Sequence, residues 1–344
     1  MRDADTKVSE PMKPDKRQTG TSADPQKEQP GTSTAPLLKC SVGIFAHNEA
    51  ANIAALLRGL SAQVLRQAQI SEIIVVSSAS TDGTDDIVRE YIKQDPRVRL
   101  ITQERREGKS AAINLFLASA TEQLLVVISG DVIPAPHTIE LLISALRDPS
   151  IGATGGRPVP VNDENGFMGY AVHLLWRLHH RMAMLSPKLG EMIAFRKVMD
   201  AIPADSAVDE ASIEALVRDA GLKLRYIPEA IISNKGPLNL KDFIKQRRRI
   251  QNGHLWLMEK QGYEVVSQDK GTLLWILLDE ALEYPFRVPK MLAVMALEIW
   301  CRMLGSWDYR VKGRNPFAWE IARSTKDLGG FDASLPGNDD EDKT

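Results

Sequence analysis

Residues 41–50 read SVGIFAHNEA, and this stretch sets the pattern of the fold. Its first six residues form a short apolar run, which predicts a buried strand, and polar residues follow at once. Residues 124–131, LLVVISGD, repeat the pattern with a fully apolar run that leads into polar residues. Strands that are apolar on both faces are typical of parallel sheets covered by helices on either side.

Apolar strands and amphipathic helices alternate along most of the chain. Ile53, Leu56 and Leu60, for example, recur at helical spacing after the first strand. The expected strands are 41–46, 72–76, 98–102, 124–128, 151–154, 192–196 and 224–227, and the expected helices are 53–60, 87–91, 111–120, 136–146, 169–185, 211–220 and 242–260. This alternation predicts an α/β fold, with a mostly parallel sheet and helices on both faces.

The two ends of the chain differ from this body. Apart from Met1, residues 1–36 carry only Val8 and Met12 as large apolar side chains, so we expect a disordered tail. The α/β domain is expected at 37–262, a helical C-terminal extension at 263–328, and a disordered acidic tail at 329–344.

The most apolar stretches of the extension are Thr272–Leu278 and Met291–Leu297, of seven residues each. A bilayer requires about 20 apolar residues, so neither stretch predicts a membrane span. We expect these helices to pack against the domain, and helices that lie on a membrane surface are the alternative.

Composition excludes several classes of protein. The 344 residues include 43 Lys and Arg against 45 Asp and Glu, and this balance argues against a dedicated nucleic-acid binder. The two cysteines, Cys40 and Cys301, exclude a disulfide scaffold and an all-cysteine zinc site, and they fit a reducing compartment. The first ten residues lack the apolar core of a secretory signal. We therefore expect a cytoplasmic location, with peripheral contact at the cytoplasmic face of the membrane left open.

Polar residues follow four of the expected strands. The sequences are HNE at 47–49, SSAS at 77–80, RREGK at 105–109 and SGD at 129–131. In an open parallel sheet, ligands bind outside the carboxyl ends of the strands. Solvated loops are the alternative, but acids, a lysine and small residues at four such ends favour a polar ligand site.

The order of motifs resembles a family-2 inverting glycosyltransferase with the GT-A fold, over about residues 40–257. The matching segments are FAHNEAANI, VVSSASTDGT, Gly108-Lys109 with Asn114, SGDVIP, VDEASIEALVRDAG and QRRRI. The resemblance implies a Rossmann-like GT-A domain that transfers a sugar from a nucleoside diphosphate sugar to a hydroxyl acceptor, with inversion. The implied acceptor is a glycan or a lipid-linked glycan, and the implied cofactor is Mn²⁺ or Mg²⁺.

The resemblance also implies a set of site residues. Those on the donor side are Ala46, Asn48, Glu49, Ser78, Lys109, Gly130 and Asp131. Gln246, Arg248 and Arg249 belong to the acceptor or diphosphate side. Asp131 holds the metal, and His254 completes the metal shell as a histidine does in some GT-A enzymes.

The chain departs from the family's pattern at four places. Ser77-Ser78 replaces an acidic pair, Ser129-Gly130-Asp131 replaces Asp-x-Asp, Asp209-Glu210 replaces Glu-Asp, and Ile250 replaces a tryptophan. These changes leave a second hypothesis open, a non-catalytic relative that binds nucleotide or glycan with a degenerate metal motif. A nucleotidyltransferase is disfavoured because FAHNEAA holds no glycine. A P-loop is excluded because Gln103 stands where its first glycine is needed.

Asp131 suits a hard divalent cation, which prefers oxygen ligands and often takes only one or two of them from the protein. Such a cation offsets the charge that builds on a leaving diphosphate. The alternative is that Asp131 is a turn residue before Ile133-Pro134.

Asp209 and Glu210 precede a helix that ends at Gly221. Inversion at an anomeric carbon requires one base that faces the acceptor hydroxyl. Counted back from Gly221, Glu210 stands where the family has its base, with Asp209 as its neighbour. An acidic pair favoured by the helix dipole is the alternative.

Other candidates have structural alternatives as well. Asn48 can cap the first helix, and the basic run 245–249 can be a solvated or membrane-facing surface. Lys109 can assist the nucleotide or form a surface ion pair. Trp176 lies where the family often forms its acceptor side, but it is typical of an apolar core.

Overall fold

The computed structural model describes residues 36–206, 208–263, 270–313 and 325. The two expected tails lie outside these residues, apart from Pro36. So do the stretches 264–269 and 314–324, which belong to the expected extension.

One eight-stranded sheet forms the centre of the fold, with strand order β3-β2-β1-β4-β7-β6-β8-β5. The strands are β1 (Leu38–Ala46), β2 (Ala68–Ser78), β3 (Val98–Gln103), β4 (Leu124–Ser129), β5 (Val132–Pro134), β6 (Ile151–Pro160), β7 (Met192–Arg196) and β8 (Lys223–Asn234). β1 pairs in parallel with β2 and with β4, β2 pairs in parallel with β3, and β6 pairs in parallel with β8. β7 is antiparallel to β4 and β6, and β5 is antiparallel to β8. The sheet is therefore mixed, with four parallel pairings among seven.

All seven expected strands are present, and three details differ from expectation. β5 was not expected, because three residues are too few to show a pattern. β6 and β8 run well beyond 154 and 227 through Gly- and Pro-containing sequence. Their pairing jumps from Gly156–Ile227 to Arg157–Ile231, so a bulge accommodates Pro228, which lacks a backbone N–H.

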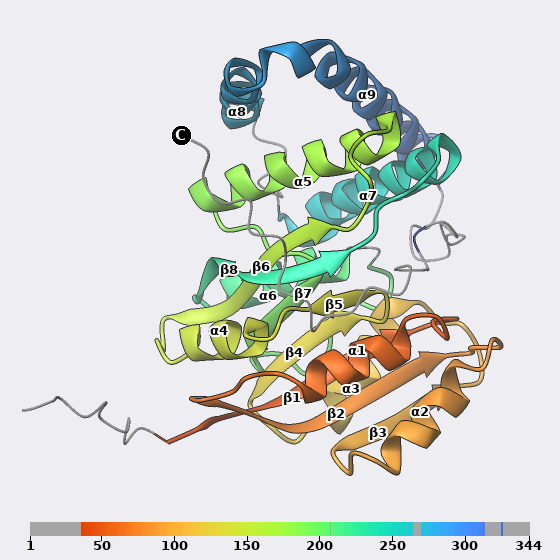
Figure 1. Cartoon of the computed structure of the whole chain (residues 1–344), viewed down its shortest axis with the longest axis vertical. Helices are drawn as coiled ribbons and strands as arrows, with labels where there is room; N and C mark the ends of the chain where they lie inside the picture. The colour runs from red at the N-terminus through yellow and green to blue at the C-terminus, as the bar shows by residue number, and fades with distance from the viewer. Residues whose placement is uncertain (1–35, 207, 264–269, 314–324, 326–344) are drawn as a thin grey trace, which may run out of the picture. The chain divides into compact units, whose positions relative to one another are not determined.

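Helices cover both faces of the sheet, as expected (Figure 1). They are α1 (Ile53–Ser61), α2 (Thr84–Ile92), α3 (Lys109–Ser119), α4 (Thr138–Ala145) and α6 (Asp209–Asp219). Leu56 of α1 and Leu142 of α4 belong to the apolar core on one face, and Phe116 of α3 and Ile213 of α6 to the core on the other. Phe116 packs directly on β1, because a Cβ atom at Gly43 would lie only 2.7 Å from its ring.

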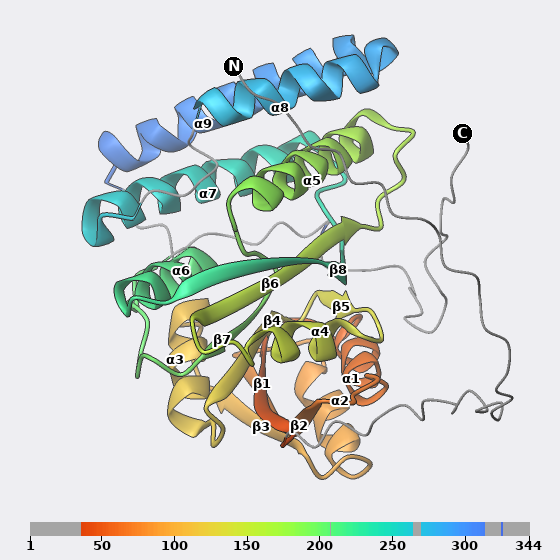
Figure 2. The same ribbon diagram turned by 90° about the vertical axis from the view of Figure 1, so that its left-hand side faces the viewer.

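A second group of helices packs beside β6 and β8: α5 (Phe167–Leu185), α7 (Leu240–Gln261), α8 (Lys270–Glu283) and α9 (Val288–Arg310), with the short 3₁₀ helix η2 (Pro285–Arg287) between the last two. α5 contacts both strands as well as α8 and α9, and α7 contacts α9. Figure 2 shows α5 and α7 between the sheet and the outer pair α8 and α9. We call α5, α7, α8, η2 and α9 the helical layer.

The two apolar stretches of the extension fall within α8 and α9, and each is divided between two environments. Leu273 and Met291 pack into the apolar core of the helical layer, whereas Trp275, Leu278 and Leu292 are exposed. The packing against the domain that was expected for α8 and α9 is therefore found on only one face of each helix. In the described ranges, no helix combines the length and apolar character required to cross a bilayer.

Candidate active site

A cavity of about 490 Å³ lies between the sheet, α6 and the helical layer. Three groups stand out among its lining side chains. We call them the acidic cluster (Lys109, Asp131, Glu191, Asp209 and Glu210), the basic cluster (Lys188, Arg247, His254 and Arg302) and the apolar wall (Leu175, Trp176, Met182, Phe243, Leu273 and Met295).

The first residues of α3 and α6 form one half of the acidic cluster. Lys109 Nζ lies 2.6 Å from Glu210 Oε1 and 3.8 Å from Asp209 Oδ2. The Ser110 hydroxyl lies 2.6 Å from Asp209 Oδ1. Burial lowers the pKa of Lys109, but the charges of Glu210 and Asp209 outweigh this effect and raise it, so the ammonium group stays charged. Both acids also lie in the first turn of α6, where the helix dipole favours negative charge.

Asp131 and Glu191 form the other half, and they come from neighbouring strands. Asp131 follows β4, and Glu191 precedes β7, whose Met192 pairs with Ile128 of β4. Burial raises the pKa of Asp131, although Lys109 opposes the shift. Burial and then the charge of Asp131 raise the pKa of Glu191 to about 7. These two buried carboxylates therefore resist carrying negative charge together.

The loops at this edge of the sheet contain strained backbone. Asn48, Ala79 and Glu191 have positive φ angles of 56°, 52° and 58°, and they are the non-glycine residues with positive φ in the described ranges. Left-handed conformations cost energy for residues with a side chain and gather at functional sites. Glu191 lines the cavity, and Asn48 and Ala79 directly adjoin lining residues in the sequence, which supports a functional role for this edge.

The donor-side residues lie where β1 and β2 end, but they have different surroundings. Ala46, Glu49 and Ser78 line the cavity. The Ser78 hydroxyl is buried and has no hydrogen-bond partner within the described part of the chain, so it is a group that a ligand can satisfy. Gly130 allows close packing, because a Cβ atom there would lie 2.8 Å from Glu49 Cγ.

Asn48 has a different role from the one that helix capping assigns to it. α1 begins at Ile53, and its N-cap residue is Asn52. The Asn48 side chain instead accepts a hydrogen bond from the backbone N–H of Thr81, at 2.8 Å, and so links the loops that follow β1 and β2. Asn48 is not among the residues that line the cavity.

The QRRRI segment at 246–250, which lies on α7, directs only some of its side chains into the cavity. Gln246 and Arg249 line it, and the charge of Arg249 acts on Asp131, Asp209 and Glu210. Arg248 was expected on the acceptor or diphosphate side, but its Nε lies 2.9 Å from Asp308 Oδ2 of α9. Its place on the helix turns it away from Arg249, because adjacent residues point about 100° apart.

His254 lines the cavity but belongs to the basic cluster. Burial lowers its pKa well below the usual value, and the charges of Lys188, Arg247 and Arg302 lower it further. The charge of Glu298 opposes that of these three residues, and the lowered pKa keeps the imidazole neutral, which is the form that binds a metal. The metal ligand expected at His254 therefore stays a prediction. The strongest influences on Asp131 come from a different set of charges, Lys109 and Arg249 among them.

The residues of the acidic cluster nevertheless fit a divalent cation. Asp131 and Glu191 offer the carboxylate oxygens that Mg²⁺ and Mn²⁺ prefer, in a place where burial disfavours their unneutralised charge. Across the described ranges, no group of three or more His, Cys, Asp or Glu residues is arranged to hold a metal ion. The chain would therefore provide one or two ligands, with diphosphate oxygens and water as the others.

Glu191, Lys188 and Arg302 were not identified from the sequence as site residues. Glu191 stands immediately before the predicted strand 192–196, and its position at the site follows only from the antiparallel direction of β7. Lys188 lies in the same connection. Burial lowers its pKa to about 8, a direction that Arg247 and Arg302 reinforce, although Glu214 opposes it.

Comparisons with known proteins agree with this architecture. The family model described as glycosyl transferase family 2 matches residues 41–216. The chain is 25% identical over 240 residues to the probable glycosyltransferase YdaM of Bacillus subtilis, a match that covers 65% of this chain and 57% of that protein. It is 28% identical over 125 residues to the glycosyltransferase AglE of Haloferax volcanii, which covers 36% of this chain and 40% of AglE. The chain thus spans about half the length of these curated relatives.

Among solved structures, the chain resembles the mannosyltransferase PcManGT from Pyrobaculum calidifontis, determined in complex with GDP-Man and Mn²⁺. The two have 21% sequence identity and a TM-score of 0.54, and the match covers 83% of this chain and 85% of the other. At this identity the likeness concerns the fold, and it confirms the expected GT-A architecture. The chain belongs to glycosyl transferase family 2.

Proposed function

We propose that the protein transfers a sugar from a nucleoside diphosphate sugar to a hydroxyl acceptor, with inversion and with a divalent cation. The observation that carries this proposal is the acidic cluster, in which two pairs of carboxylates surround Lys109 inside one cavity. The two acidic pairs would have separate roles, with Asp131 and Glu191 beside the diphosphate and Asp209 and Glu210 beside the acceptor.

The donor is assigned to the edge of the sheet formed by β1, β2 and β4. Ser78 offers a hydroxyl to the nucleoside, and Asp131 provides a carboxylate at the diphosphate. The cation would be held by Asp131, with Glu191 beside it, and would supply positive charge that stabilises the leaving diphosphate. Arg249 adds a fixed positive charge on the same side.

Glu210 is the better candidate for the base. Its side chain is 27% exposed, whereas that of Asp209 is 7% exposed and lies against the Ser110 hydroxyl. Burial raises the pKa of Glu210, but the charge of Lys109 and its hydrogen bond lower it by more, so Glu210 is ionised and able to accept a proton. Glu210 would take the proton of the acceptor hydroxyl, while Asp209 and Ser110 fix the start of α6.

The rest of the cavity favours a lipid-linked acceptor over a free glycan. The apolar wall draws Trp176 and Met182 from α5, Leu273 from α8 and Met295 from α9. A free glycan would leave these apolar side chains poorly matched, whereas the apolar part of a lipid would bury them. Lys188 of the basic cluster complements the phosphate groups that join a lipid to a glycan, whereas Glu298 already neutralises part of the charge of Arg247 and Arg302.

The test is release of nucleoside diphosphate from a panel of nucleoside diphosphate sugars, with Mn²⁺, with Mg²⁺ and with chelator. We expect one donor to be hydrolysed slowly even without acceptor, and only with a cation. Stable binding of a nucleotide, seen as a raised melting temperature, with no release under any condition would instead support the non-catalytic binding relative.

A matched variant identifies the metal ligand. Asp131→Asn should remove the cation-dependent part of the nucleotide-induced rise in melting temperature, because an amide lacks the negative charge that a hard cation requires. Glu107→Gln, in the loop before α3, is the control and should retain it. Equal cation-dependent rises in Asp131→Asn and the wild type would contradict the assignment.

A further inference from the structure

The outer helices α8 and α9 reverse the usual arrangement of charged and apolar side chains. Of the 21 large apolar side chains that are exposed in the described ranges, 11 lie between Leu274 and Val311. They include Trp275, Trp300 and Trp307, which are 60%, 53% and 57% exposed, and Phe286 of η2, which is 98% exposed. Isolated exposed apolar residues are ordinary, but a contiguous set on two neighbouring helices marks an interaction surface.

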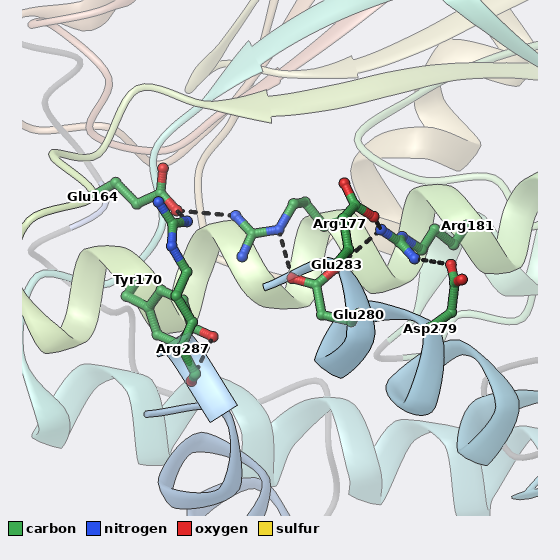
Figure 3. A network of polar contacts seen from close by, with 8 residues as sticks. All are labelled: Glu164, Tyr170, Arg177, Arg181, Asp279, Glu280, Glu283 and Arg287. Atoms are coloured by element: carbon green, nitrogen blue, oxygen red, sulfur yellow. Dashed lines mark hydrogen bonds and ion pairs between the residues drawn. The ribbon is translucent and has the colours of Figure 1, made fainter. Parts of the chain in front are cut away.

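The acids of these helices point the other way, toward the protein. Arg177 Nε of α5 lies 3.0 Å from Glu280 Oε1 of α8, and Arg181 pairs with Asp279 and Glu283 (Figure 3). On α9, Glu298 Oε1 lies 2.6 Å from Arg247 Nη2 of α7. The inner face is therefore held by ion pairs, and the acidic charge of both helices is taken up there.

Along α9, which is described in full, ten residues are exposed. Eight are apolar and two are basic, and no exposed residue is acidic. The buried positions Met291, Val294, Glu298, Cys301, Gly305 and Asp308 recur every three or four residues on the opposite face. The basic pair, Lys290 and Arg310, stands at the two ends of the exposed stripe.

We infer that the outer face of α8, η2 and α9 docks on an anionic lipid surface and lies in the plane of the membrane interface. An apolar stripe with tryptophans fits the boundary between headgroups and acyl chains, where Trp is favoured. Arg310 complements anionic headgroups, as does Lys290, whose ammonium also lies 5.9 Å from the centre of the Tyr170 ring of α5. A water-soluble protein partner would ordinarily meet a rim of both charge signs, whereas the exposed stripe of α9 offers only positive charge, and the half-exposed acids of α8, Asp279 and Glu283, are paired with Arg181.

This docking places the bilayer beside one wall of the cavity. Leu273 of α8 and Met295 of α9 line the cavity with their inner sides, while Trp275 and Trp300 of the same helices face outward. The inference stands without the proposed transferase activity, because it depends on the outer face alone.

The test is co-sedimentation of the full chain with vesicles of phosphatidylcholine and phosphatidylglycerol at low salt. We expect the wild type to sediment with these vesicles and to sediment less with pure phosphatidylcholine or at high salt. Replacing Trp275, Trp300 and Trp307 by Ser should reduce the vesicle partition coefficient by about tenfold or more, because affinity scales with the buried apolar area. Leu115→Ser, at an exposed apolar position of α3, is the matched control and should bind as the wild type does.

A second readout separates docking from misfolding. Lipids brominated on their acyl chains should quench the tryptophan fluorescence of the wild type and of Leu115→Ser, but much less that of the triple variant. Near-identical melting temperatures of the three proteins without vesicles would show that the variants are folded. A wild type that stays in the supernatant would overturn the inference, as would binding that the triple variant retains. A dimer in vesicle-free solution that the triple variant loses would also overturn it, and would assign the face to a second copy of the chain.

Discussion

The α/β body and the helical layer differ in how they are stabilised, because the layer adds buried ion pairs to an apolar core of its own. In the body, apolar side chains such as Ile44 and Phe116 fill the interior. In the helical layer, the carboxylates of Glu280, Glu298 and Asp308 are buried against arginines, while tryptophans face outward. The body follows the rule for a protein in water, and its stability comes from buried apolar area. The outer helices carry many apolar side chains on their exposed face, an arrangement that the inferred docking on a lipid surface explains.

The largest change in stability is expected in the body. Phe116→Ala should lower the free energy of unfolding by about 3–5 kcal/mol, because it leaves a cavity against β1. Urea denaturation measures this loss. Leu115→Ala, on the exposed side of the same helix, should cost far less, and equal losses would break the distinction between the two faces of α3.

A smaller but still large loss is expected in the helical layer. Glu298→Gln leaves the partly buried guanidinium groups of Arg247 and Arg302 without their counter-charge, and should cost roughly 3 kcal/mol. The control is Glu90→Gln, whose partner Lys93 is equally exposed, with an expected change of about 0.5 kcal/mol or less. If Glu298→Gln unfolds in urea as readily as Glu90→Gln does, ion pairs do not hold the layer together.

The stability that Glu298 contributes should depend on pH. Burial raises the pKa of Glu298, but Arg247 and Arg302 lower it by more, from 4.5 to about 2. A depressed carboxyl pKa adds stability above the unfolded value, and this stability is lost as the pH falls through the folded value. The difference in unfolding free energy between the wild type and Glu298→Gln should therefore be full above pH 4.5 and shrink toward pH 2. A difference that stays constant over this range would show that charge is not its source.

The smallest change in stability is expected on the outer face. Trp300→Ser should lower the free energy of unfolding in vesicle-free buffer by only about 1 kcal/mol, because the residue is 53% exposed in the folded protein. Thermal unfolding is sufficient to measure it. A loss as large as that of Phe116→Ala would mean that the outer face is packed against the chain itself.

The sequence predicted the α/β body well because its strands are apolar on both faces, as LLVVI at 124–128 is. Strand direction was not predictable, since an apolar run reads the same in a parallel and an antiparallel pairing. Glu191 was missed for that reason. β6 and β8 were predicted too short, because Pro158 and Pro228 resemble strand ends until a bulge is known to accommodate them.

The other members of the acidic cluster were named from motif order, whereas the directions of the side chains in the basic run on α7 could not be. Arg248 and Arg249 are neighbours in sequence, yet one pairs with Asp308 and the other lines the cavity. Separating them requires knowledge of which face of α7 meets α9. The same limit applies to α8 and α9, where apolar content alone indicated packing and could not say which side chains face outward.

The central claim is that Glu210 is the base, and the most direct measurement is the rate of nucleoside diphosphate release by Glu210→Gln and by Asp209→Asn at saturating donor. A general base contributes about 10²–10⁴ in rate with little effect on ground-state binding, so Glu210→Gln should lose that much while donor affinity hardly changes. Asp209→Asn should lose less. If Asp209→Asn is inactive and Glu210→Gln keeps most of its rate, the base is Asp209. If both variants keep their rate, the acidic pair only stabilises the start of α6 and the proposed mechanism is wrong.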